Sequence, residues 1–297
     1  MLKRIYSSGP FWMVVATLCF AMMGVFVKLG SRDFSTGELV FYRSLVALVM
    51  IYVSVRVQGR GRSLKVPPTL LRLHLTRSIV GTSSMLLLFY AIAHLPLPTA
   101  VTLNNTSSIF LMLISVLWLG QRPGRMQIVA ILLGFVGVVL LLRPSFSGSQ
   151  WLACLIALTS AFGGAIALYN VRELGKAGEP EWRTVFYFSV AGIGVALIWM
   201  LFEQRPLAKI TFENIAYLLG MAVCATGGQL CLTRAYQRGR SLVVASLNYL
   251  NVMFSSLFGV LIWSDSLPLL SYVAMSLIVA GGIVGAAAGM RPAAQKA

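Results

Sequence analysis

Three amide side chains lie inside long apolar stretches of the chain, where an unpaired polar group costs free energy. Asn104 and Asn105 fall about seven residues into the stretch 97–119, and Asn248 falls equally deep in the stretch 241–263. An amide donates and accepts hydrogen bonds, so it can bind a polar solute without the deep energy well of a full charge. The sequence therefore predicts a solute-binding site at these amides. The alternative stays open that they only join neighbouring helices, at about 0.6 kcal/mol per bond.

Two tyrosines and a glutamine supply further hydrogen-bonding groups near these amides. Gln229 lies in an apolar stretch of the second half of the chain, and Tyr249 directly follows Asn248. Tyr90 lies at the end of an apolar stretch in the first half. Because tyrosine also gathers at membrane–water interfaces, these tyrosines are expected either in the solute pathway or in an interfacial belt. We include Gln229, Tyr249 and Tyr90 among the expected substrate-binding residues.

Two charged residues near the start of the stretch 37–56 are candidates for a functional role. Arg43 lies six residues past Gly37, and its planar guanidinium can bind a substrate carboxylate through two parallel hydrogen bonds. Pairing with Glu38 is the alternative. None of the eight acidic residues lies near the centre of an apolar stretch, so the sequence predicts no carboxylate relay at mid-membrane. If protons drive transport, Glu38 is the expected coupling residue.

The composition of the chain excludes an ordinary soluble domain. Hydrophobic residues make up 58% of the chain and charged residues only 11%, against about 25% charged residues in soluble domains. Too few polar side chains remain to cover a soluble core, so lipid must solvate the chain. The net charge of +16 is explained by the cytoplasmic loops of membrane proteins, which collect Lys and Arg. We expect a lipid bilayer and a small-molecule substrate as partners, and no nucleic acid, cofactor or metal ion.

Ten stretches of the chain have the length of about 20 mostly apolar residues that a membrane-spanning helix needs. They cover residues 10–30, 37–56, 73–93, 97–119, 126–142, 150–170, 183–202, 213–234, 241–263 and 269–290. All eleven prolines lie between these stretches or at their ends. Because proline inside a helix removes a hydrogen bond that lipid cannot replace, the sequence predicts ten uninterrupted helices. In the fourth, residues 105–109 contain no proline, which predicts a more polar and less kinked helix.

The chain also contains an internal repeat. Residues 89–121 match residues 233–265 at an ungapped shift of 144 positions. Residues 41–44 (FYRS) match residues 186–189 (FYFS) at a shift of 145 positions. Because the matches keep the same order along the chain, the sequence predicts two copies of one unit, as in many secondary transporters.

Basic residues set the expected orientation of the two units, residues 1–145 and 146–297. With both termini in the cytoplasm, 18 of the 24 Lys and Arg residues, Arg77 among them, fall on the cytoplasmic side, as the positive-inside rule requires. Five spans per unit then insert with opposite topology. The predicted fold is an all-α integral membrane protein of ten transmembrane helices in two inverted five-helix repeats, N-in and C-in. Asn104 and Asn248 would then approach a common axis from opposite sides.

Four runs of residues, spread over nearly the whole chain, carry a family resemblance. They are FAMMGVFVKLGS (20–31), FYAIAHLPLPTAVTL (89–103), LWLGQRP (117–123) and RAYQRGRSLVVASLNYL (234–250). Together they resemble the drug/metabolite transporter superfamily, specifically its EamA-type ten-helix members. The resemblance implies a carrier of small metabolites, with a central cavity lined by the first four helices of each half and the fifth and tenth helices at the periphery. The chain departs from the family pattern at Gln121, where glutamate is usual.

The leading hypothesis is a secondary transporter of the cytoplasmic (bacterial inner) membrane that moves a small metabolite by alternating access. An interior without carboxylates favours an amino-acid-like or other neutral or zwitterionic solute, and the resemblance favours export. Two alternatives stay open: an importer of a vitamin or nucleoside-like metabolite, and a membrane-embedded enzyme. No histidine cluster, paired deep carboxylates or metal-ligand spacing supports the enzyme. Small residues at Gly281, Gly285 and Gly289 would permit a homodimer.

Overall fold

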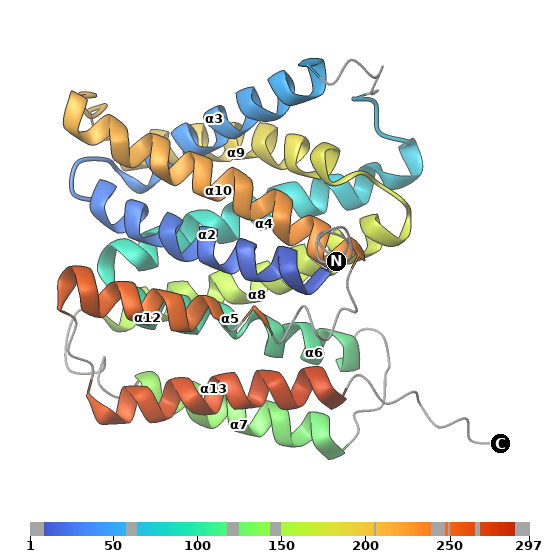
Figure 1. Cartoon of the computed structure of the whole chain (residues 1–297), viewed down its shortest axis with the longest axis vertical. Coiled ribbons are helices and arrows are strands. Elements are labelled where there is room, and N and C mark those ends of the chain that lie inside the picture. The colour runs from blue at the N-terminus through green and yellow to red at the C-terminus, as the bar shows by residue number, and fades with distance from the viewer. Residues whose placement is uncertain are drawn as a thin grey trace.

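A computed structural model describes residues 9–57, 64–117, 125–142, 150–204, 206–238, 247–248, 250–264 and 268–288. Within these ranges the regular secondary structure is entirely helical. The helices are α2 (Gly9–Gly30), α3 (Thr36–Val57), α4 (Pro68–His94), α5 (Leu97–Asn105), α6 (Ser107–Leu117), α7 (Arg125–Leu142), α8 (Trp151–Lys176), α9 (Glu181–Glu203), α10 (Phe212–Arg238), α12 (Leu250–Trp263) and α13 (Leu269–Ala288). They form one bundle, in which α2 begins and α13 ends on the same side (Figure 1).

The helices have the length and surface of membrane-embedded segments. Six of those described, α2, α3, α4, α8, α9 and α10, are long and apolar enough to cross a membrane, and α12 and α13 contain shorter apolar segments. Helical residues occur in each of the ten apolar stretches of the sequence. Large apolar side chains face outward, such as Leu201 and Phe202 at 76% and 80% exposure. Lipid is the solvent that suits such a surface.

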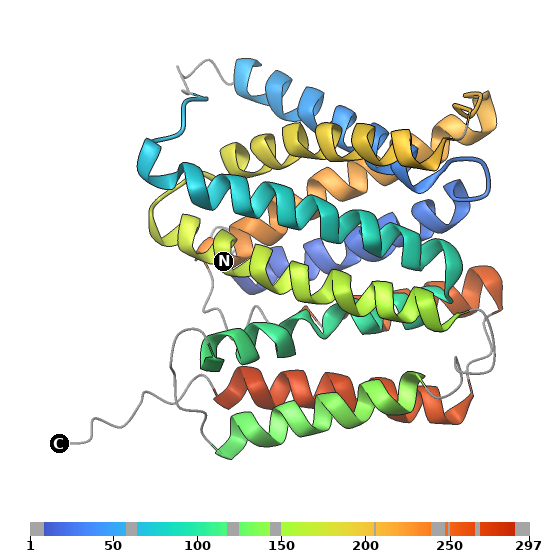
Figure 2. The ribbon, with the colours of Figure 1, turned by 180° about the vertical axis from the view of Figure 1, so that it is seen from behind.

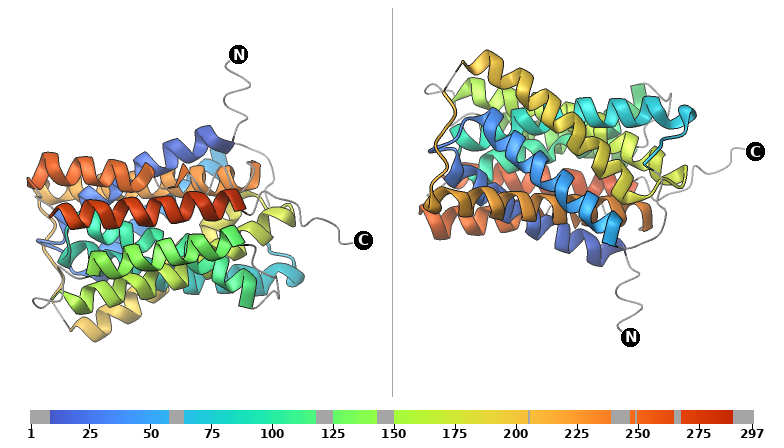
Figure 3. Two further views of the ribbon diagram at one scale, coloured as in Figure 1. Left: turned by 90° about the horizontal axis from the view of Figure 1, so that it is seen from below. Right: turned by 90° about the horizontal axis from the view of Figure 1, so that it is seen from above.

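The two halves of the chain pack through matching helix pairs. α2 packs along α10, and the pair that corresponds to it under the repeat, α8 and α4, also packs side by side (Figure 2). α3 packs on α9, α5 on α12, and α7 on α13, so each of these helices contacts its own counterpart in the other half. α7 and α13 lie next to each other at the bottom edge of the bundle in Figure 1, which is the side that faces the viewer in the left view of Figure 3.

The fourth apolar stretch is interrupted at Thr106, so the prediction of a continuous helix over residues 97–119 is wrong. The N–H of Thr106 bonds to the carbonyl oxygen of Leu103, three residues back, at 3.1 Å. Side chains take carbonyl oxygens of the preceding turn: Thr102 Oγ1 donates to Pro98 at 2.6 Å, and Asn105 Nδ2 donates to Val101 at 2.9 Å. Such side-chain bonds compete with the helical hydrogen bonds and bend helices without a proline.

Gly137 allows α7 and α13 to pack closely. A Cβ atom at this position would lie 2.9 Å from the carbonyl oxygen of Ala274 and 3.0 Å from the amide nitrogen of Ile278, which are backbone atoms. We expect Gly137→Leu to force the two helices apart and to lower the free energy of unfolding by roughly 1–3 kcal/mol. Thermal unfolding in detergent measures this. Gly194→Leu is the matched control, because a Cβ at Gly194 meets no atom within 4 Å; equal melting temperatures of the two variants would contradict the packing.

Candidate functional site

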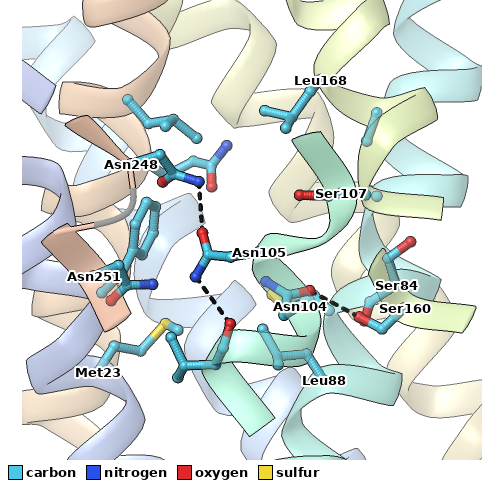
Figure 4. A pocket seen from close by; sticks show the side chains of 18 of the residues that line it. Met23, Ser84, Leu88, Asn104, Asn105, Ser107, Ser160, Leu168, Asn248 and Asn251 are labelled. Carbon is cyan, nitrogen blue, oxygen red and sulfur yellow. Dashed lines mark hydrogen bonds between the residues drawn. The ribbon is translucent and has the colours of Figure 1, made fainter. Parts of the chain in front are cut away.

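A cavity of about 170 Å³ lies inside the bundle. Residues of α2, α3, α4, α5, α6, α8, α9, α10 and α12 line it, whereas no described residue of α7 or α13 does. Helices of both halves therefore enclose the cavity, with α7 and α13 outside it, as the family resemblance implies. The interruption at Thr106 borders the cavity, because Asn105 before it and Ser107 after it are both lining residues (Figure 4).

A hydrogen bond between two amide side chains joins the end of α5 to the residues before α12. Asn248 Nδ2 donates to Asn105 Oδ1 at 2.8 Å, and Asn105 Nδ2 donates to the Val101 carbonyl oxygen (Figure 4). Asn105 is only 2% exposed. The amide of Asn105 is therefore satisfied by the protein, and its bond to Asn248 links the two halves of the chain at the level of the cavity.

Asn104 lies on a different part of the cavity wall, beside α8. The Ser160 hydroxyl donates to the Ser84 carbonyl oxygen at 2.6 Å and lies 3.3 Å from Asn104 Oδ1 (Figure 4). No hydrogen bond is made by Asn104 Nδ2 to any residue that the structure describes. This N–H group is therefore free to donate to a solute.

Two arginines, Arg43 on α3 and Arg77 on α4, line the cavity. Their exposed fractions are 3% and 5%. The Cζ atoms of Arg43 and Arg77 lie 5.2 Å and 4.2 Å from the ring centroid of Phe188 on α9. Among the described residues, Arg43 Nε and Nη1 and Arg77 Nε have no hydrogen-bond partner. Three helices thus place two buried positive charges around one aromatic ring.

Arg77 is counted from the sequence among the basic residues of the cytoplasmic side, but the structure buries its side chain inside the bundle. α4 begins at Pro68 rather than at residue 73, which places Arg77 about 14 Å along the helix axis. Proline is favoured at the first position of a helix, so Pro68 is the sequence signal for this earlier start. Gly81, one turn further on, leaves room for the guanidinium, since a Cβ atom there would collide with Arg77 Nη1.

The other predicted substrate-binding residues separate into three groups. Gln229 lines the cavity, and its buried Nε2 has no hydrogen-bond partner within the described ranges. Tyr249 lies outside the described residues. Tyr90 is not among the lining residues, because its ring stacks on His94 in the last turn of α4, with centroids 4.1 Å apart. Substrate binding by Gln229, Tyr249 and Tyr90 stays a prediction.

Glu38 lies in the first turn of α3 and is not among the described lining residues. Its Oε2 accepts the N–H of Ser35 at 2.8 Å, while Ser35 Oγ accepts the N–H of Glu38 at 3.3 Å, which is a capping box. Glu38 Oε1 accepts the N–H of Ala208 at 2.7 Å. The carboxylate therefore binds two backbone N–H groups instead of the Arg43 guanidinium. A role of Glu38 in proton coupling stays a prediction.

The bundle of apolar helices encloses a cavity whose mostly apolar wall carries a few polar groups and two arginines. This arrangement defines the class of the protein: it is an integral, multi-pass membrane protein built to hold a small solute. A sequence profile of the EamA-like transporter family matches residues 7–143 and, a second time, residues 151–285. The chain belongs to the EamA-like transporter family. It is thus a membrane transporter of the cytoplasmic membrane for a small molecule, and not an enzyme.

Curated relatives align along most of the chain. The pseudopaline exporter CntI of Pseudomonas aeruginosa is 30% identical over 96% of this chain and 95% of its own length. An uncharacterized transporter of Helicobacter pylori is 27% identical over 93% of both chains. The riboflavin transporter of Vibrio cholerae is 25% identical over 91% of this chain and 90% of its own. A solved crystal structure superposes with a TM-score of 0.67 at 17% identity, covering 97% and 98% of the two chains, which shows a shared fold.

The bond between Asn105 and Asn248 can be tested by a double-mutant cycle. We expect Asn105→Ala and Asn248→Ala to show a coupling energy of about 0.6–1.7 kcal/mol in unfolding, the range for hydrogen bonds between membrane helices. Thermal or denaturant unfolding of the four proteins in detergent gives this value. Asn104→Ala combined with Asn248→Ala is the control, and its effects are expected to add, because Asn104 lies beside Ser160 instead. Additive effects in the first pair would show that the bond contributes no stability.

Proposed function

We propose that the protein is a secondary transporter that moves a small metabolite by alternating access around the central cavity. The observation that carries the proposal is that helices of both halves enclose a cavity with unsatisfied hydrogen-bond donors on its wall. Buried polar groups without partners cost free energy. A solute that bonds to Asn104 Nδ2, Gln229 Nε2 and the guanidinium groups would lower this cost, which is what binding requires.

We infer that ten spans cross the membrane, in two inverted halves with both termini in the cytoplasm. The matching helix pairs support this, because the contacts α2–α10 and α8–α4 are those that a two-fold axis between the halves would exchange. The contact between Arg43 and Phe188 supports it too. The two residues occupy equivalent positions of the repeat, and residues related by a two-fold axis can touch each other only where they lie close to that axis. Without Arg43 and Arg77, which line the cavity, 17 of the other 22 Lys and Arg residues fall on the proposed cytoplasmic side.

The size of the cavity favours a compact metabolite. Its volume of about 170 Å³ is below the roughly 300–1,000 Å³ of sites for drug-sized ligands. An amino-acid-like solute fits this space better than a vitamin of the size of riboflavin, so we favour the first over import of a vitamin or nucleoside. Similarity to an exporter along nearly the whole chain supports export as the direction.

A homodimer stays a prediction. Gly281 is buried inside the monomer, where a residue cannot serve a surface between subunits. Gly289, another member of the proposed face, lies outside the described part of the chain.

Counterflow in proteoliposomes tests the carrier. Vesicles loaded with a candidate solute should accumulate the same labelled solute from outside, with a rate that saturates as its concentration rises. A screen of amino acids, vitamins and nucleosides identifies the solute. A rate that stays proportional to concentration, without counterflow, would indicate a channel instead.

Filling the cavity should block transport without unfolding the protein. A Cβ atom at Gly164, on the cavity wall, meets only Ser107 Cβ at 3.8 Å, so a leucine there would extend into the cavity. We expect Gly164→Leu to weaken solute binding at least about tenfold, since a loss of roughly 1.4 kcal/mol suffices. Gly194→Leu, away from the cavity, should transport normally. Unchanged counterflow in Gly164→Leu would contradict the placement of the solute.

A further inference from the structure

We propose that Arg43 and Arg77 form a subsite for acidic groups, and that the transported solute carries two carboxylate groups. The inference rests on the proposed function, because it takes the central cavity as the place where the solute binds. It changes the expected solute from neutral or zwitterionic to acidic. The reason for this change is Arg77. The structure places Arg77 in the cavity wall, against the Phe188 ring that Arg43 also contacts.

The two guanidinium groups are buried and close to each other. Arg43 and Arg77 are 3% and 5% exposed, and both lie against Phe188, near enough for their charges to repel. A buried charge is stable only when an opposite charge and hydrogen bonds compensate its lost hydration. Phe188 offers the face of its ring to both cations, but a ring face does not satisfy the directional N–H donors of a guanidinium.

The protein supplies no opposite charge to this site from the part of the chain that the structure describes. Seven of the eight acidic residues belong to that part, and none of them lines the cavity. The eighth, Asp265, lies outside it. Arg43 Nε and Nη1 and Arg77 Nε also lack hydrogen-bond partners among the described residues. A bound molecule can supply both the missing charge and the missing acceptors.

A pair of carboxylates fits these requirements best. A guanidinium binds one carboxylate through two parallel hydrogen bonds, so two guanidiniums match two carboxylates in charge and in donors. The amide N–H groups of Gln229 and Asn104 add neutral donors to the lining of the same cavity. A cationic solute would meet only like charge beside the two arginines, and a neutral one would leave both charges uncompensated.

Ligand binding to the purified protein in lipid nanodiscs, measured by calorimetry, tests the charge requirement. The ligands are succinate, glutarate and glutamate, with succinamide, glutaramide and glutamine as neutral counterparts of the same shape. We expect the acids to bind and the amides not to bind. Equal binding of an acid and its amide would overturn the proposal. Equal binding of sulfate would also overturn it, because the site would then be one for inorganic anions only.

Substitutions of the two arginines separate binding from folding. We expect Arg43→Gln and Arg77→Gln each to weaken binding of glutarate roughly 30-fold or more, the loss typical when one partner of a buried charge pair is removed. Arg43→Lys should restore part of the affinity, because it keeps the charge. Without ligand, the glutamine variants should melt at or above the wild-type temperature, since an unpaired buried charge is gone. Lower melting together with unchanged affinity would mean that the arginines only support the fold.

Arg56→Gln is the matched control, because Arg56 lies on the same helix but is exposed and bonds to Tyr52. Its affinity for glutarate should equal that of the wild type. Counterflow of labelled glutarate then distinguishes this inference from the proposed function. Saturable counterflow of a neutral solute that glutarate does not inhibit would keep the carrier and refute the acidic subsite. Binding of glutarate without counterflow of any solute would keep the subsite and refute the carrier.

Discussion

Inside a bilayer no water is available to bond the polar groups of a protein, so each group needs a partner in the protein or in a bound solute. Around Thr106 the protein meets this constraint by itself. The side chains of Thr102, Asn105 and Thr106 donate to carbonyl oxygens one turn back. The residues that disturb the helix are therefore also the ones that keep its carbonyl groups bonded, and the helix can break beside the cavity without a proline.

At three other residues that line the cavity the protein leaves the same constraint unmet. Arg43, Arg77 and Gln229 each have a buried N–H group without a partner in the described part of the chain. Elsewhere, carboxylates and their partners meet at helix ends, as between Glu181 and Arg234 at 2.7 Å. Positive charge at the centre is thus separated from negative charge at the ends. This separation makes the centre a place for an anion.

A feature of the fold or of the site could be predicted from the sequence where neighbouring residues along the chain determine it. The apolar runs predict the helices, and the internal repeat, at a shift of 144 residues, aligns Asn248 with Asn104, next to Asn105. Both features can be read from the sequence because each is carried by contiguous residues. The inward turn of Arg77 is different. An arginine near the start of a helix looks the same whether it extends to the headgroups or turns inward. The choice depends on Gly81 and on Phe188, which belongs to the other half of the chain.

The bonds at the two ends of the bundle bear on how such a carrier could alternate. Where α3 begins, Glu38 accepts the N–H of Ala208 from the α9–α10 connection. Where α9 begins and α10 ends, on the other side, Arg234 binds Glu181, and their side chains are 33% and 19% exposed. An ion pair that water can reach contributes only about 0–1 kcal/mol, because water replaces the lost partner. Water does not replace a partner of the buried central guanidiniums in this way, so losing an anion from the centre costs more free energy than opening the ion pair at one end.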